Sequence, residues 1–188
     1  MINRIKTLAT LALFCGFIGQ TMAQDTQTDS HTLNISVPEV ILLDIEPSEN
    51  TLVSIAPEAP EEAGEALDFT NATDNSLWLN YSSIVDPDEK RTVTVGITAG
   101  EVPAGLLLKV TAAADAGNGD GIVGTPSSTL TLSSTAQNII TNIGSCYTNS
   151  PENNGHQLTY DLEEAENGYG SLEVKDVDLT ITYTLTDI

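Results

Sequence analysis

The sequence contains few cysteines, histidines and aromatic residues, and these shortages exclude several kinds of protein. Of its two cysteines only Cys146 lies beyond residue 23. Residues 1–23 are typical of a cleaved signal peptide, so the mature chain cannot form an internal disulfide. A hydrophobic core must therefore supply the stability that bridges give to many small secreted domains. We expect Cys146 to be buried as a small apolar residue.

Positive charge is also scarce. All 27 acidic residues lie beyond residue 23, and the chain has a formal net charge of −21. Such a surface repels nucleic acid and anionic lipid, so we expect neither as a partner. High negative charge is most simply explained by the solubility of an extracellular protein, and the alternative is that some carboxylates bind Ca²⁺. The only basic residues of the expected mature chain are Lys90, Arg91, Lys109 and Lys175.

The chain lacks an apolar run long enough to span a membrane as a helix. The longest run, Leu8 to Ile18, covers 11 residues, whereas a spanning helix needs about 20. It follows Arg4 and Lys6 and precedes the small residue Ala23, an arrangement that is typical of a bacterial export signal. We therefore expect an exported protein in the periplasm, on the cell surface or outside the cell. We interpret residues 24–31 as a flexible polar leader.

Apolar residues alternate with polar ones over most of residues 32–188, which we interpret as a single domain. Period-two alternation in short runs, separated by Gly, Asn and Pro clusters, predicts half-buried strands. The expected fold is all-β, an immunoglobulin-like antiparallel β-sandwich. The alternating sets are Leu33, Ile35 and Val37; Ile41, Leu43 and Ile45; Leu52 to Ile55; Leu77 to Tyr81; Val93, Val95 and Ile97; Leu106, Leu108 and Val110; Leu130 and Leu132; Leu158, Tyr160 and Leu162; and Leu179, Ile181, Tyr183 and Leu185.

Three segments need separate interpretation. Asn167-Gly168 is suited to a tight turn, so we predict a hairpin in which Leu172 and Val174 follow the strand at 158–162. Pro57 to Ala66 is predicted to be a loop. Ser134 to Ile143 contains an isoleucine pattern that fits either a short helix or another strand.

No residue pattern indicates catalysis, and we expect the protein not to be an enzyme. A nucleophile needs a base within hydrogen-bond reach, and the nearest candidates are Cys146, Asn154 and His156 around one loop. In cysteine hydrolases the nucleophile and the base come from elements that are distant in the sequence, which disfavours catalysis by Cys146 and His156. A pair of carboxylates suited to glycoside hydrolysis is neither excluded nor supported by their number. We therefore predict no catalytic residues.

One glycine-rich segment is a candidate calcium loop. Asp115, Asn118 and Asp120 offer oxygen ligands within a flexible stretch, as Ca²⁺ prefers. Their spacing departs from the EF-hand pattern, and a turn without metal is the favoured alternative. We expect no other cofactor.

Trp78 is the candidate binding aromatic. It lies in the expected strand from Leu77 to Tyr81, where alternation places Trp78 and Tyr81 on opposite faces. An outward Trp78 would anchor an interface or a ligand, and the alternative is packing within the sandwich.

The export signal, the extended segment from Thr32 to Ile45 and the Thr-rich final strand resemble pilin-type subunits of Gram-negative surface fibres. The likeness also extends to uncharacterised secreted β-sandwich proteins, which imply no established activity. The internal disulfide of many pilins is impossible here. The fibre resemblance implies a structural or adhesion-type protein that assembles by strand exchange with copies of itself or other surface-fibre subunits.

In that mechanism Leu33, Ile35 and Val37 are the inserting residues, and the alternative is that they form the molecule's own first strand. A second hypothesis is an extracellular carbohydrate-binding or surface-binding module, assisted by Ca²⁺.

Overall fold

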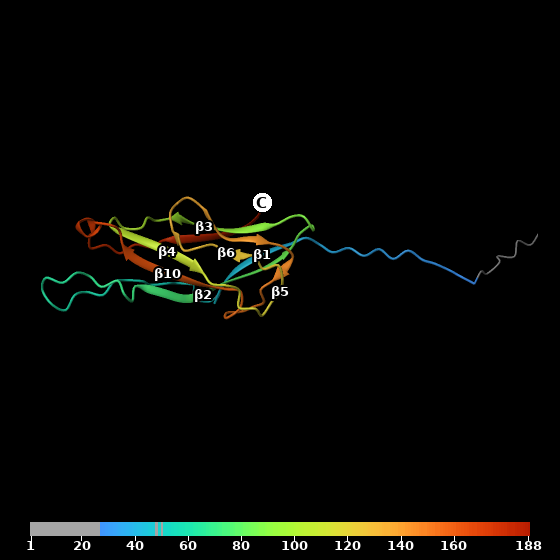
Figure 1. Ribbon diagram of the computed structural model, residues 1–188, viewed down its shortest axis with the longest axis horizontal. Helices are drawn as coiled ribbons and strands as arrows, with labels where there is room; N and C mark the ends of the chain where they lie inside the picture. Colours follow the sequence, from blue (N-terminus) through green and yellow to red (C-terminus); the bar gives the residue numbers. More distant parts are fainter. Residues whose placement is uncertain (1–26, 48, 50) are drawn as a thin grey trace, which may run out of the picture. The chain divides into compact units, whose positions relative to one another are not determined.

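The computed structural model describes residues 27–47, 49 and 51–188 (Figure 1). The expected signal peptide, residues 1–23, and the first part of the expected leader lie outside this range. Residues 37–188 form one compact unit, and the described residues before Val37 belong to a second unit. No helix among the described residues is long and apolar enough to cross a membrane.

The compact unit is a sandwich of two antiparallel sheets, which confirms the predicted all-β fold (Figure 1). The immunoglobulin-like topology stays a prediction. The first sheet has the order β5 (Asp120–Gly121), β9 (Cys146–Tyr147), β2 (Thr73–Ile84), β10 (His156–Glu164), β4 (Leu106–Ala112) and β7 (Leu130–Thr131), with β1 (Val40–Glu46) also paired to β2. The second has the order β11 (Thr180–Asp187), β3 (Arg91–Ala99), β8 (Gln137–Ile143) and β6 (Thr125–Pro126).

Alternation along the long strands builds the core. Leu77 and Leu79 of β2 are buried together with Val93 and Val95 of β3. Every second side chain of each strand points into the space between the two sheets, where the side chains of the two sheets pack together. Each fully buried Leu or Val side chain contributes roughly 1.5–3 kcal/mol relative to an exposed one. The core therefore stabilises the fold without a disulfide, and Cys146 is buried within it as expected.

The predicted hairpin around Asn167-Gly168 is wrong. Asn167 does turn the chain, with a φ of 57°, but the chain then enters a short 3₁₀ helix, η1 (Tyr169–Ser171). Strand β10 is already paired with β2 on one side and β4 on the other, so no edge remains for residues 172–174. Val174 is fully exposed.

The expected strand at residues 52–55 is not part of any ladder. Its side chains still alternate between exposed and half-buried, and Val53 and Ile55 are the ones that pack against the core. Alternation indicates which side chains face the core, not whether the backbone finds a partner. Residues 57–66 contain no helix, in agreement with the predicted loop.

Strand β8 (Gln137–Ile143) occupies most of the ambiguous segment 134–143. Its apolar pattern imitates a helix because the pairing of β3 with β8 shifts register, so that the adjacent Ile139 and Ile140 are both buried. Such a bulge breaks period-two alternation without ending the strand. The strand alternative was the correct one.

Candidate functional site

The N-terminal segment before β1 carries an exposed apolar row. Leu33, Ile35 and Val37 are 74%, 79% and 73% exposed, and residues 28–39 have no assigned secondary structure. The first paired strand begins at Val40, later than the sequence predicted. Three alternating apolar side chains in this state have the pattern of a strand that lacks a sheet.

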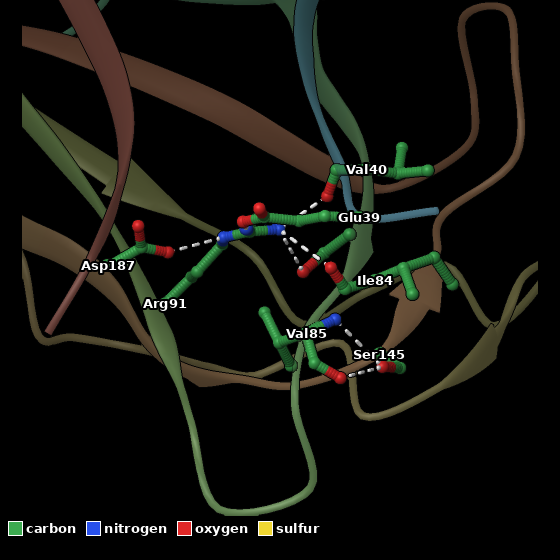
Figure 2. A network of polar contacts seen from close by, with 8 residues as sticks. Glu39, Val40, Ile84, Val85, Arg91, Ser145 and Asp187 are labelled. Carbon is green, nitrogen blue, oxygen red and sulfur yellow. Dashed lines mark hydrogen bonds and ion pairs between the residues drawn. The ribbon is translucent and has the colours of Figure 1, made fainter. Parts of the chain in front are cut away.

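A buried arginine contacts the start of β1 (Figure 2). Arg91, the first residue of β3, has no exposed surface. Its Nη2 donates to Glu39, just before β1, and its Nε donates to Asp187 Oδ1, in the last residue of β11, at 2.8 Å. Both carboxylates are mostly exposed, so water solvates them while they neutralise the buried cation.

The same guanidinium also binds the backbone of the first sheet (Figure 2). Nη1 of Arg91 donates to the carbonyl of Val40 and lies 3.2 Å from Ser83 Oγ and 3.4 Å from the carbonyl oxygen of Ile84. The start of β1, the end of β2 and the end of β11 are therefore held at one point. This role was not predicted from the sequence, although an arginine that opens the alternating run of β3 was a signal for it.

Both β1 and β11 are edge strands. Several of their inward side chains are only half-buried, and we call this partly exposed row of apolar side chains the rim. Within the described residues β1 pairs only with β2, and β11 pairs only with β3. Leu43 and Ile45 of β1 and Ile181 and Tyr183 of β11 are half-buried against the core. The two strands contact each other, so this rim runs along one side of the sandwich.

The three candidate calcium ligands make hydrogen bonds within the protein. Asp115 Oδ2 accepts from the Gly117 amide at 2.8 Å, and Asp120 Oδ1 accepts from the Gly121 amide at 2.7 Å. Asn118 donates to the carbonyl of Asn153 in a neighbouring loop, at 3.3 Å. Within the described chain no three His, Cys, Asp or Glu side chains gather as metal ligands. Calcium binding here stays a prediction.

Trp78 lies on the outer face of the first sheet. Its neighbours Leu77 and Leu79 are buried in the core, whereas Trp78 is half-buried between Glu46 of β1 and Gln157 of β10. Tyr81 is on the inner face and is 3% exposed. Trp78 is therefore the outward aromatic of this strand.

Cys146 is not activated as a nucleophile. Burial, followed by the nearby Asp115 carboxylate, raises the pKa of its thiol to about 11, so the thiol stays protonated at neutral pH. No hydrogen bond joins Cys146 to His156 among the described residues. In the described residues the thiol is therefore neither ionised nor hydrogen-bonded to an imidazole base.

His156 is instead fixed inside a polar cluster. Its Nδ1 lies 2.8 Å from the Ala113 carbonyl oxygen and its Nε2 lies 2.8 Å from the Tyr81 hydroxyl. That hydroxyl also contacts the Val123 carbonyl. It has a single hydrogen, for which the Val123 carbonyl oxygen and His156 Nε2 are both acceptors. Burial raises the pKa of Tyr81, so the hydroxyl remains a neutral donor. The cluster joins β2 to the loops before β5 and β6.

Comparisons of the chain with protein families, curated proteins and solved structures found no match.

Replacing Arg91 with Ala is expected to lower the free energy of unfolding by about 2–5 kcal/mol, as for other large buried side chains that are shortened to Ala. The change leaves a cavity and removes the donors of the Val40 and Ile84 carbonyls. Glu39→Gln is the matched control, because Glu39 is mostly exposed and its loss of charge should cost less than about 1 kcal/mol. Urea denaturation measures both. Equal effects of the two substitutions would contradict the central role of the guanidinium.

His156 is expected to make the protein less stable below pH 6.5. Burial lowers the pKa of its imidazole from 6.5, although the Ala113 carbonyl and Asp115 oppose this shift. The unfolded chain then binds the proton more readily, so the free energy of unfolding falls as the pH drops from 6.5 toward the folded pKa.

The measurement is thermal or urea unfolding across this pH range for the wild type, His156→Gln and His31→Gln. The His156 variant should lose part of the pH dependence, whereas the variant of the exposed His31 should keep it. A wild type that becomes more stable on acidification through His156 would show that the folded state binds the proton instead.

Proposed function

We propose that the protein is an exported structural subunit that assembles into surface fibres by donating residues 32–37 to a neighbouring copy. The observation that carries this proposal is the row formed by Leu33, Ile35 and Val37, whose side chains alternate and are all more than 70% exposed. Soluble proteins rarely leave such a row uncovered unless it has a binding role.

The donated segment has the properties required for strand addition. In this mode backbone hydrogen bonds provide affinity, and alternating side chains enter pockets of the acceptor. Complete burial of Leu33, Ile35 and Val37 contributes roughly 5–9 kcal/mol before the entropic cost of association is subtracted. The intervening Thr32, Asn34 and Ser36 are polar and face water in the same arrangement.

The acceptor in this proposal is the free edge of β11. Its outward side chains are Thr180, Thr182, Thr184 and Thr186. Lysine and proline, which proteins use to protect an edge from further pairing, are missing from this strand. Beside it, half-buried Ile181 and Tyr183 supply apolar surface that an added strand would cover.

Donor and acceptor are different surfaces of one chain, so each copy can donate to one neighbour and accept from another. Such a head-to-tail contact forms an open filament when its rotation does not close a ring. The network of Arg91 supports this arrangement, because it fixes Glu39, two residues after the donor segment, and Asp187, where the acceptor strand ends. The expected signal peptide and acidic surface are consistent with a secreted fibre.

Replacing Leu33, Ile35 and Val37 together with Ser is expected to abolish assembly of residues 24–188, because the donated strand loses its apolar face. Light scattering across a concentration series measures assembly. The matched control replaces Thr32, Asn34 and Ser36 with Ala, which leaves the apolar row intact. Thr184→Lys places a charge on the acceptor edge and is expected to reduce assembly in the same assay.

A synthetic peptide of residues 30–39 provides a second test. It should raise the melting temperature of a chain that begins at residue 38, as linkage requires for a bound ligand, and the peptide with Ser at the three apolar positions should not. A wild-type chain that stays monomeric at every concentration, and a truncated chain that ignores the peptide, would exclude strand donation.

A further inference from the structure

The outer face of the first sheet contains a groove that strand donation does not use. It has a volume of about 560 Å³ and is formed by β1, β2, β9 and the residues that follow β9. All of its residues belong to the unit of residues 37–188. Its volume lies in the range of small-molecule sites.

The strand register determines which side chains share this face. Leu42 of β1 and Tyr147 of β9 both pair with Ser82 of β2, one on each side of it, and Asp44 pairs with Asn80. Directly opposed residues of antiparallel strands project to the same face of a sheet. Leu42 is 65% exposed and Tyr147 is 51% exposed, so they form two apolar walls on either side of a polar floor.

Several polar groups in the groove have unused hydrogen-bonding capacity. The hydroxyls of Ser82, Tyr147 and Ser150 have no partner within the described part of the chain. Asp44 uses Oδ1 to accept from the Ile45 amide at 2.9 Å, and its other oxygen is unpaired in that range. These groups are available to a ligand rich in hydroxyls.

A buried amide in the floor is only half satisfied. Asn80 is 5% exposed, its Nδ2 donates to the Pro151 carbonyl at 2.8 Å, and its Oδ1 is buried without a partner among the described residues. Buried polar groups are rarely left unpaired, because each unmade bond costs about 1–3 kcal/mol. This Oδ1 is covered by protein and lies next to Gly155, so Asn80 shapes the floor of the groove without offering that oxygen to a ligand.

The charge of the groove limits the ligand. Asp44 is the one ionised side chain that lines it, and no Lys or Arg does, so an anionic ligand would be repelled. A ligand that matches it must offer flat apolar faces to Tyr147 and Leu42 and hydroxyls to Asp44 and the serines. We infer that the groove binds a neutral carbohydrate, with a pyranose ring against Tyr147 and neighbouring hydroxyls on Asp44.

Trp78 extends the same face. Trp78, Asn80 and Ser82 alternate along β2, so their side chains project to one side. Trp78 and Ser82 are four positions apart along β2, a distance of roughly 13 Å. A short oligosaccharide would therefore reach from Tyr147 toward Trp78, and it should bind more tightly than a monosaccharide.

The test begins with an array of short neutral oligosaccharides built from glucose, galactose, mannose or N-acetylglucosamine, with sialylated and sulfated sugars for comparison. The strongest neutral sugar is then titrated by calorimetry into the assembly-deficient chain with Ser at positions 33, 35 and 37. This chain separates sugar binding from fibre assembly, so failure of one proposal leaves the other standing.

Tyr147→Ala is expected to raise the Kd about tenfold or more, which is a loss of about 1.4 kcal/mol, whereas Tyr147→Phe should keep most of the affinity. Tyr169→Ala is the matched control, because Tyr169 is similarly exposed, at 44%, and is not among the residues that line the groove. Asp44→Ala provides a second loss-of-binding variant if Tyr147→Ala does not fold. Binding of no neutral sugar, preference for anionic sugars, or unchanged affinity in both loss variants would overturn the inference.

Discussion

A single buried cation determines how the edges of this sandwich are arranged. Taking an arginine out of water costs several kcal/mol unless its charge is paired and its N–H groups are hydrogen-bonded. Arg91 meets this requirement only when Glu39, the β1 and β2 backbone and Asp187 are all in place. The neutralisation of one charge therefore couples the first strand, the second strand and the last strand of the chain.

This coupling explains why the exposed N-terminal row lies next to an ordered strand in the sequence. The segment of residues 32–37 has too little apolar surface to form a sheet alone, since isolated strands are not stable in water. From Glu39 onward the arginine network and the pairing of β1 with β2 hold the chain. The boundary between unpaired and paired backbone thus falls where Arg91 makes its contacts.

The strands and the inner face were largely predictable from the sequence, because period-two alternation directly reports which side chains the core covers. Leu77, Leu79 and Tyr81 illustrate this. The predictions from sequence failed where the structure depends on pairing between strands that are far apart in the sequence. Both edges of β10 were occupied, so Asn167-Gly168 could not begin a hairpin. A register shift between β3 and β8 gave β8 a helix-like pattern. The groove was missed for the same reason, since Leu42 and Tyr147 are more than 100 residues apart and only the register with Ser82 brings them onto one face.

The two proposed surfaces are compatible because they use different parts of the sandwich. Strand donation uses the backbone edge of β11 in the second sheet, whereas the groove uses the outer side chains of β1, β2 and β9 in the first. A fibre formed through β11 would leave one groove open on every copy. Repeated sites on one filament raise the effective concentration for each further contact, so weak binding of a single sugar becomes strong attachment to a sugar-coated surface. In this arrangement assembly supplies the avidity that a shallow, open groove lacks.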